Sequence, residues 1–323
     1  MKRAILSFAS LALLTFATTL RADTVLTTVT VGPEPTGIAA NPATNKIYVA
    51  IDATGEVAVI NGKTQQVTAR LIVGRNAIAI AVNPFTNRIY ASGCDSAACN
   101  IWVIDGKTDT LLTNIPINSG DFLGIQALAV NPVTDRVYAS DADNQQLIVI
   151  DGKTNTIVTQ VFVPIQPAGI GVNPRTNRIY VGNGGFPGKI LVFDGATNTQ
   201  IAEVPESSSV QGVATNFRLN RVYGTVVGGN VLSVIDGSTN QEATEVPTGR
   251  FPNGVDVNLF NNKVYVADSN DGDVTIIDGN TNQVLQTVPL LAGFPNGVAV
   301  NLATGLTYIT DFNSDRVIVL QPN

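Results

Sequence analysis

Seven tyrosines divide this chain at a nearly constant interval. They are spaced 42, 48, 42, 43, 42 and 43 residues apart, at Tyr48, Tyr90, Tyr138, Tyr180, Tyr223, Tyr265 and Tyr308. Each ends a version of the phrase N-P-x-T-N-[KR]-[IV]-Y, complete at 41–48, 83–90 and 173–180 and degenerate as NLFNNKVY and NLATGLTY near the end. A repeat of about 40 to 45 residues with strand-like content predicts the blades of a β-propeller rather than independent domains.

Each repeat contains four short apolar runs separated by turn signals. In the first repeat the runs are 37–42, 45–51, 56–62 and 65–74. Runs of this kind predict a four-stranded antiparallel meander, and no segment shows a sustained helical period. Asn-Pro pairs recur at the turn after the first run of a repeat. Asp-Gly pairs, such as 105–106 and 151–152, recur at the turn after the third run. At these turns we expect proline to fix φ and glycine to supply a positive φ.

Both ends of the chain carry an incomplete repeat. The last repeat stops after a third strand at 316–320, whereas 24–32 matches the fourth strand of the other repeats. One strand, six full blades and three more strands give 28. We therefore predict an all-β, seven-bladed propeller over residues 23–323, with four antiparallel strands per blade and the N-terminal strand completing the last blade. The tyrosines fall on second strands, where we expect them to pack against the adjoining blade.

The first 22 residues have the pattern of a secretory signal peptide. Lys2 and Arg3 precede an apolar stretch at 4–20, and the tripeptide at 20–22 comes before a polar start at Asp23. We expect cleavage after Ala22, because the stretch is short for a membrane span and is diluted by serine and threonine. The sequence thus predicts a periplasmic or secreted mature protein, monomeric and without a membrane span.

Charge and rare residues exclude several classes of protein. Residues 1–22 hold three of the 19 cations and none of the 25 acids, so the mature chain has 16 cations, 25 acids and a net charge of −9. Its cations are scattered, which argues against a nucleic-acid partner. The two cysteines, Cys94 and Cys99, are predicted to form a local disulfide in an oxidising compartment. The lack of histidine excludes histidine-dependent lyases, haem with axial histidine and Ser-His-Asp hydrolases.

The phrases NPATNKIYVA, NPRTNRIYVG and VIDGKTNT resemble the YVTN-type β-propeller repeat family, which is found in bacterial exported proteins and archaeal surface-layer proteins. The resemblance covers essentially the whole mature chain and implies a seven-bladed propeller of the exported kind. Because relatives on the same fold include binding proteins, lyases and lactonases, it implies no particular activity. Repeats five to seven depart from the Asn-Pro pair, with Phe217, Leu259 and Leu302 in place of proline.

Alternate loops of a meander lie on opposite faces of the ring. The Asn-Pro and Asp-Gly turns share a uniform face, whereas the loops between second and third strands and the links between blades share a variable face, where binding residues usually lie. Three candidate ligand-binding carboxylates follow the tyrosine by three residues, and four amides precede the inner strand and should circle the central opening. Asp256 is the one charge at a position otherwise held by alanine or glycine, and two arginines lie in the links. The candidates are Asp141, Asp268, Asp311, Gln126, Gln211, Asn253, Asn296, Asp256, Arg75 and Arg250.

Three functions are compatible with these residues. The first is an exported, non-enzymatic scaffold without a cofactor, which binds a protein, a glycan or a small molecule at its variable face. The second is a metal-dependent lyase or lactone hydrolase, with a divalent cation such as calcium held by Asp141, Asp256, Asp268 or Asp311. Absence of histidine, the usual general base, argues against it. The third is a surface-layer or adhesion module. The carboxylates have an alternative role, because aspartate is also a common turn residue.

Overall fold

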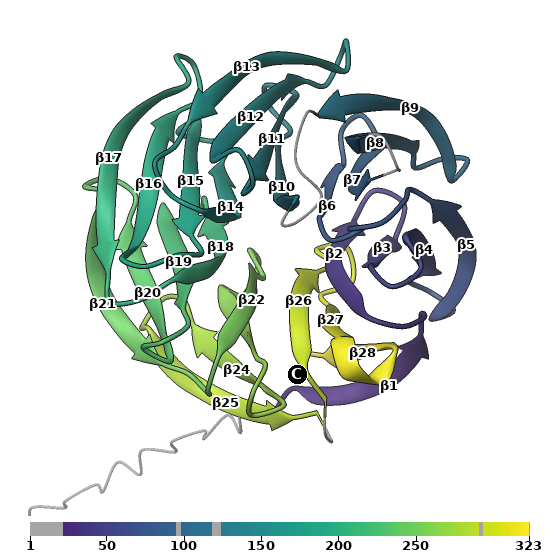
Figure 1. Ribbon diagram of the computed structural model, residues 1–323. Coiled ribbons are helices and arrows are strands. Elements are labelled where there is room, and N and C mark those ends of the chain that lie inside the picture. Colours follow the sequence, from purple (N-terminus) through teal and green to yellow (C-terminus); the bar gives the residue numbers. More distant parts are fainter. Residues whose placement is uncertain (1–21, 95–97, 118–123, 291–292, 323) are drawn as a thin grey trace, which may run out of the picture.

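Seven four-stranded antiparallel sheets surround a central axis as the blades of a propeller (Figure 1). The computed structural model describes residues 22–94, 98–117, 124–290 and 293–322. The predicted signal peptide therefore lies outside the described residues, apart from Ala22. The helical structure in the described residues is the three-residue 3-10 helix η1 (Phe312–Ser314), and no helix in this part of the chain is long and apolar enough to cross a membrane.

Six blades run outward from the axis in chain order, and the seventh ends with the N-terminal strand. The first four blades are β2 (Pro35–Asn41), β3 (Lys46–Ile51), β4 (Glu56–Asn61), β5 (Gln66–Ile72); β6 (Ile80–Asn83), β7 (Arg88–Cys94), β8 (Cys99–Asp105), β9 (Thr110–Ile117); β10 (Ile125–Asn131), β11 (Arg136–Asp141), β12 (Gln146–Asp151), β13 (Thr156–Phe162); and β14 (Pro167–Asn173), β15 (Arg178–Asn183), β16 (Gly188–Asp194), β17 (Thr199–Glu206). The last three are β18 (Val210–Asn216), β19 (Arg221–Val226), β20 (Val231–Asp236), β21 (Gln241–Pro247); β22 (Pro252–Val257), β23 (Lys263–Asp268), β24 (Asp273–Asp278), β25 (Gln283–Pro289); and β26 (Pro295–Val300), β27 (Thr307–Asp311), β28 (Arg316–Gln321), β1 (Thr24–Thr30).

The N-terminal strand closes the ring, as predicted. Strand β1 pairs antiparallel with β28, from Thr24 opposite Gln321 to Thr30 opposite Arg316. The sheet order β1-β28-β27-β26 makes β1 the outermost strand of blade 7. The first described strand and the last thus share one sheet (Figure 1), and blade 7 has four strands like the other six.

All seven tyrosines are fully buried. Each belongs to a hydrophobic cluster shared with the next blade: Tyr48 packs with Ile80 and Ile89 of blade 2, and Tyr308 packs with Ile38 of blade 1 across the closure. Burying a large aromatic side chain removes ~150 to 250 Å² from water, which contributes several kcal/mol. The predicted packing of the tyrosines between blades is confirmed, and their role is to hold the ring together.

The turns between the first and second strands also connect neighbouring blades. Asn41 accepts the Ala43 amide through Oδ1 at 3.0 Å, and its Nδ2 donates to Asn87 Oδ1 of blade 2 at 2.7 Å. Five further links of this kind join Asn83 to Asp135, Asn131 to Asn177, Asn173 to Asn220, Asn216 to Asn262, and Asn301 to Asn45. Gly305 stands where the seventh acceptor would be, opposite Asn258. The repeated phrase is therefore a set of contacts between blades as well as a turn.

The Asp-Gly turns differ from the prediction. Their glycines do not have a positive φ; the left-handed residue is the last of the turn, such as Asp109 (φ 53°) or Asn155 (φ 55°). Glycine is needed for a close approach, because a Cβ on Gly106 would lie 2.2 Å from Asn87 Oδ1. The Gly106 amide also donates to Asn87 O at 2.9 Å. The expectation that glycine supplies the positive φ was therefore wrong, since asparagine and aspartate also adopt that conformation.

Candidate functional site

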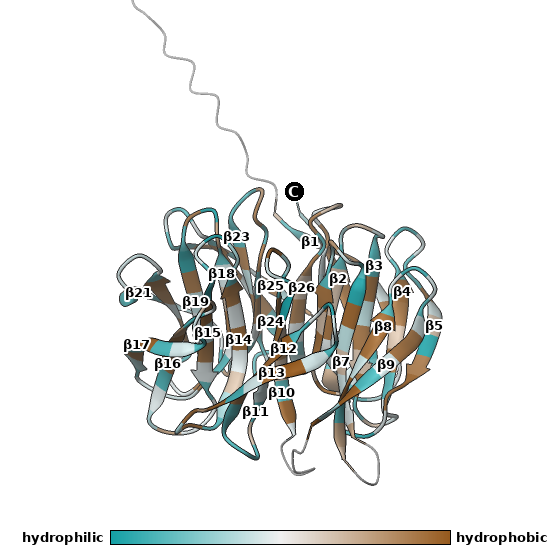
Figure 2. Ribbon diagram, turned by 90° about the horizontal axis from the view of Figure 1, so that it is seen from above, coloured by the Kyte–Doolittle hydropathy of each residue, from teal (hydrophilic) through white to brown (hydrophobic). Residues whose placement is uncertain are grey.

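The loops of the propeller emerge on two opposite faces, which Figure 2 shows from the side. We call the face with the Asn-Pro and Asp-Gly turns the turn face, and the opposite one the variable face. Innermost strands begin at the variable face, because each is entered from a link between blades. The start of each innermost strand is therefore brought to one place around the axis, at the mouth of the central opening.

Seven equivalent residues surround this mouth, one from each blade. They are Thr36, Ile78, Gln126, Ala168, Gln211, Asn253 and Asn296, and they line a cavity of about 210 Å³ together with Gly37 and Gly169. The four amides proposed from the sequence are thus brought together; we call Gln126, Gln211, Asn253 and Asn296 the amide ring. None of the residues that line this cavity is ionisable.

An aliphatic layer lies beneath the amide ring. A second cavity of about 180 Å³ is lined by the same four amides and by one branched residue from each innermost strand: Ile38, Ile80, Leu128, Ile170, Val213, Val255 and Val298. Innermost strands approach one another closely here. A Cβ added to Gly254 of β22 would lie only 2.2 Å from Asn296 O of β26. The mouth therefore has neutral, hydrogen-bonding walls, which lead to an aliphatic layer along the axis.

The three carboxylates that follow the tyrosines are all fully buried and bonded within their own blade or link. Asp141 accepts the Asn144 Nδ2 at 2.9 Å. Asp311 accepts the Phe294 amide at 2.9 Å and pairs with Arg316 at 3.0 Å. These bonds order the loops of the variable face, and neither carboxylate lines the mouth cavity.

Asp268 forms a carboxyl pair with Asp273. The two residues lie opposite each other on β23 and β24, and Asp268 Oδ2 accepts the Thr275 hydroxyl at 2.6 Å. Burial, and then repulsion from Asp273, raise the pKa of Asp268 to about 7, and burial also raises the pKa of Asp273. Because two adjacent carboxylates cannot both ionise cheaply, the pair retains a proton near neutral pH.

Asp256 joins two innermost strands. Its Oδ1 accepts the Val257 amide and its Oδ2 accepts the Val300 amide of blade 7, both at 2.8 Å. Although the residue as a whole is only partly buried, its carboxyl group is enclosed, and this burial raises its pKa to about 6. Asp256 is absent from the lining of both mouth cavities, so it lies apart from the amide ring.

The remaining candidates from the sequence lie in the links and in one hairpin. Arg250 is exposed and pairs with Asp271 at 2.6 Å. Arg75 is also exposed and its backbone forms a bridge with Cys94. Cys94 and Cys99 form the predicted disulfide, with an S–S distance of 2.00 Å, across the β7–β8 hairpin. Residues 95–97 of that hairpin loop lie outside the described residues.

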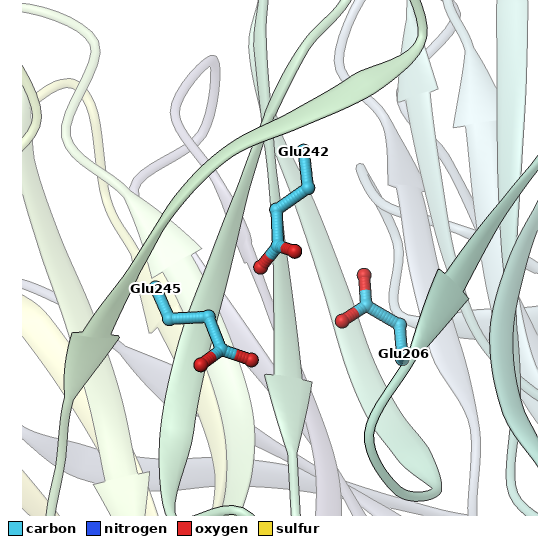
Figure 3. Close-up of side chains that lie close together, drawn as sticks. All are labelled: Glu206, Glu242 and Glu245. Atoms are coloured by element: carbon cyan, nitrogen blue, oxygen red, sulfur yellow. The ribbon is translucent and has the colours of Figure 1, made fainter.

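One cluster of carboxylates was missed by the sequence reasoning. Glu206 at the end of β17 meets Glu242 and Glu245 of β21 (Figure 3), and one carboxylate oxygen from each lies within 4.8 Å of the others. Ser233 Oγ donates to Glu206 Oε1 at 2.9 Å. Burial raises the pKa of Glu206 to about 7, and the charges of Glu242 and Glu245 add to the effect. Within the described residues, this is the one group of three or more acidic, histidine or cysteine side chains whose potential ligand atoms lie so close to one another.

Three phenylalanines, also unrecognised from the sequence, lie in loops of the variable face. Phe251 and Phe294 precede Asn253 and Asn296 by two residues, and Phe312 lies in η1. Their ring centroids are 6.2 Å apart for Phe251 and Phe294 and 6.3 Å apart for Phe294 and Phe312, within the usual range for aromatic pairs. We call these residues the aromatic strip. The doubled phrase F-P-N-G at 251–254 and 294–297 was the signal that could have revealed it.

Comparisons with known proteins give the fold and no family. No protein-family model and no curated protein sequence matches the chain. Among solved structures, it is similar to a chain titled Kuenenia stuttgartiensis hydrazine synthase, with a TM-score of 0.75 and 16% sequence identity over 89% of this chain and 95% of that chain. At this identity the likeness shows the propeller fold alone.

Proposed function

We propose that this protein is an exported, non-enzymatic propeller of the YVTN type that binds a neutral, polar ligand at the mouth of its variable face. The observation that carries the proposal is the convergence of Gln126, Gln211, Asn253 and Asn296 on one cavity whose lining contains no ionisable group. Side-chain amides both donate and accept hydrogen bonds without carrying charge. Such walls suit hydroxyl or amide groups of a ligand better than an ion.

The chemistry of the mouth favours binding over catalysis. A general acid or base must lie within hydrogen-bond reach of its proton, and the residues that line the cavity offer none. Asp256, the nearest carboxylate in sequence to the amide ring, is bonded to two backbone amides. The disulfide between Cys94 and Cys99 supports export, because disulfides persist in oxidising compartments.

The metal-dependent enzyme is the alternative against which this proposal is tested. None of Asp141, Asp256, Asp268 and Asp311 belongs to a described group of three or more close acidic ligands. Each instead accepts hydrogen bonds from neighbouring protein groups. This arrangement supports a structural role for these carboxylates over a shared cation.

A thermal-shift screen of the mature protein, residues 23–323, tests the proposal. The compounds are uncharged polyols, saccharides and amides, a matched set of charged metabolites, and calcium with and without chelator. The Gln211→Ala/Asn253→Ala double variant removes half of the amide ring, and Ala168 shows that the frame accepts alanine at this position. Gln200→Ala, at an exposed position on β17, is the control.

We expect uncharged polar compounds to raise the melting temperature of the wild type and of Gln200→Ala, and the double variant to bind them at least tenfold more weakly. Stabilisation by calcium alone, reversed by chelation, would overturn the proposal in favour of the metal-dependent alternative. Binding that the double variant leaves unchanged would also overturn it, because the ligand would then lie elsewhere.

A further inference from the structure

The aromatic strip extends the mouth of the propeller toward blade 7. Phe251 lies in the link that enters β22, and Phe294 lies in the link that enters β26. Phe312 follows β27, the second strand from the axis, and its amide donates to Phe294 O at 3.0 Å. The strip therefore begins in the two links that lead to Asn253 and Asn296 and continues to the loop after the second strand of blade 7, on the same face.

Phe251 holds a backbone conformation that disfavours a bulky side chain. Its φ is 58°, in the left-handed region. The equivalent link positions are also left-handed in blades 1, 2 and 3, where they are occupied by Glu34 (φ 55°), Asn76 (φ 54°) and Gly124 (φ 63°). Glycine and asparagine adopt this conformation readily. The other three blades with this left-handed link position place glycine or a polar residue there, whereas blade 6 places a phenyl ring there.

Burial does not account for that phenyl ring. Phe251 is 36% exposed, so the hydrophobic gain that offsets strain in a core is only partly present. The Phe251 amide donates to Asn230 Oδ1 at 3.1 Å, and the Phe251 carbonyl oxygen accepts from the Ser269 backbone amide at 3.0 Å. These two bonds hold the strained residue with its ring against Phe294. Strain kept by the surrounding structure at an exposed position indicates a functional site.

We infer that the amide ring and the aromatic strip together bind an uncharged glycan, an inference that rests on the proposed function of the mouth. A sugar ring has an apolar C–H face that stacks on aromatic rings, and hydroxyl edges that hydrogen-bond to amides. The variable face presents both surfaces, because Phe251 and Phe294 come two residues before Asn253 and Asn296 in the links that enter blades 6 and 7. One sugar unit occupies the mouth, and the next stacks on a ring of the aromatic strip.

The charges near the strip argue against an anionic ligand. The nearest cation in sequence to the strip is Arg250, and its guanidinium is already paired with Asp271 at 2.6 Å. The Asp271 Oδ2 also accepts the Arg250 amide at 2.7 Å. A glycan without carboxylate or phosphate groups therefore fits this site better than a charged one.

Calorimetric titration with uncharged trisaccharides tests this inference. The probes are trimers of glucose, galactose and N-acetylglucosamine in α and β linkage. Phe251→Asn removes the ring and places at this position the residue that blade 2 uses, and Phe294→Ala removes the central ring of the strip. Phe85→Ala is the control, because Phe85 is 73% exposed in an Asn-Pro turn on the opposite face.

We expect at least one trisaccharide to bind the wild type and Phe85→Ala equally, and both strip variants to bind it at least tenfold more weakly. Phe251→Asn should melt at or above the wild-type temperature, which separates lost binding from lost folding. Equal affinity in the strip variants would overturn the inference. Binding of uncharged non-saccharides or peptides through the amide ring, with no trisaccharide bound, would overturn it while the proposed function stands. If neither binds at the mouth, both fail.

Discussion

Asp23 and Lys263 form an ion pair, with Asp23 Oδ1 2.6 Å from Lys263 Nζ, that joins the start of the closing strand to blade 6. The other Asp23 oxygen accepts the Tyr265 hydroxyl at 2.9 Å. Asp109 makes the same contacts with Lys46 and Tyr48 between blades 1 and 2. The N-terminal segment thus reproduces an ordinary contact between blades at the point where the chain closes the ring.

Asp23→Ala should destabilise the mature protein strongly. The side chains of Asp23 and Lys263 are 1% and 12% exposed, and removing one partner of a buried pair costs about 3 to 5 kcal/mol. Urea unfolding measures the loss. The control is Lys189→Ala, whose pair with the half-exposed Glu203 should contribute at most about 1 kcal/mol. Equal effects of the two substitutions would show that Asp23 does not secure the closure.

Gly305→Asn should complete the set of asparagine links between blades. Gly305 has a φ of 77°, which asparagine tolerates, and a Cβ at this position would lie 3.9 Å from Asn258 Nδ2 and 3.3 Å from Pro322 Cγ near the chain end. A new hydrogen bond and a less flexible unfolded chain should together stabilise by about 1 kcal/mol. Gly305→Ala is the matched control, because it adds the Cβ without the acceptor and should destabilise. A melting temperature no higher for asparagine than for alanine would contradict the role of the links.

Glu206→Gln should stabilise the protein at pH 8 and have little effect at pH 4. The folded pKa of Glu206, about 7, lies above its unfolded value of 4.5, so the folded state holds the proton more tightly. The stabilisation from this proton is complete below about pH 4.5 and is lost as the pH rises to about 7, a change of roughly 1 to 3 kcal/mol. Glutamine keeps an acceptor for Ser233 without the charge. Unfolding at both pH values measures the difference, with Glu203→Gln as the exposed control; a pH-independent effect would contradict the account.

Asp256→Ala should become less harmful as the pH rises. The folded pKa of Asp256, about 6, exceeds its ordinary value of 3.8, so the wild type loses stability between about pH 4 and pH 6 as the buried group ionises. Alanine removes this loss, although it also removes acceptors for the Val257 and Val300 amides. Alanine occupies the equivalent position in five blades. The difference in melting temperature between variant and wild type should shift in favour of the variant from pH 4 to pH 8, and a constant difference would argue against an enclosed charge.

The ring could be predicted from the sequence because its signals are periodic and local. The spacing of the tyrosines gave the number of blades, and the incomplete repeats at the two ends gave the pairing of β1 with β28. The amide ring could be predicted by aligning the repeats, because its members occupy one position of the repeat: Gln126, Gln211, Asn253 and Asn296. In each case one residue per blade has an equivalent environment, so alignment of the repeats also aligns the positions in space.

Features that depend on unlike residues from different blades could not be predicted. The cluster of Glu206, Glu242 and Glu245 requires that the end of β17 lie against β21, and no repeat position marks that contact. In the Asp-Gly turns, glycine is needed for the close approach of Gly106 to Asn87 and not for a positive φ. That approach is a packing constraint rather than a local preference. The aromatic strip likewise requires that the links of blades 6 and 7 bring Phe251 and Phe294 side by side.

The central claim is that a ligand binds at the mouth of the variable face, and its most direct test is a crystal structure of the mature protein grown with the most stabilising compound of the screen. The account predicts ligand density within hydrogen-bond distance of Gln126, Gln211, Asn253 and Asn296. Density on the turn face, or an ion between Glu206, Glu242 and Glu245 with an empty mouth, would contradict it.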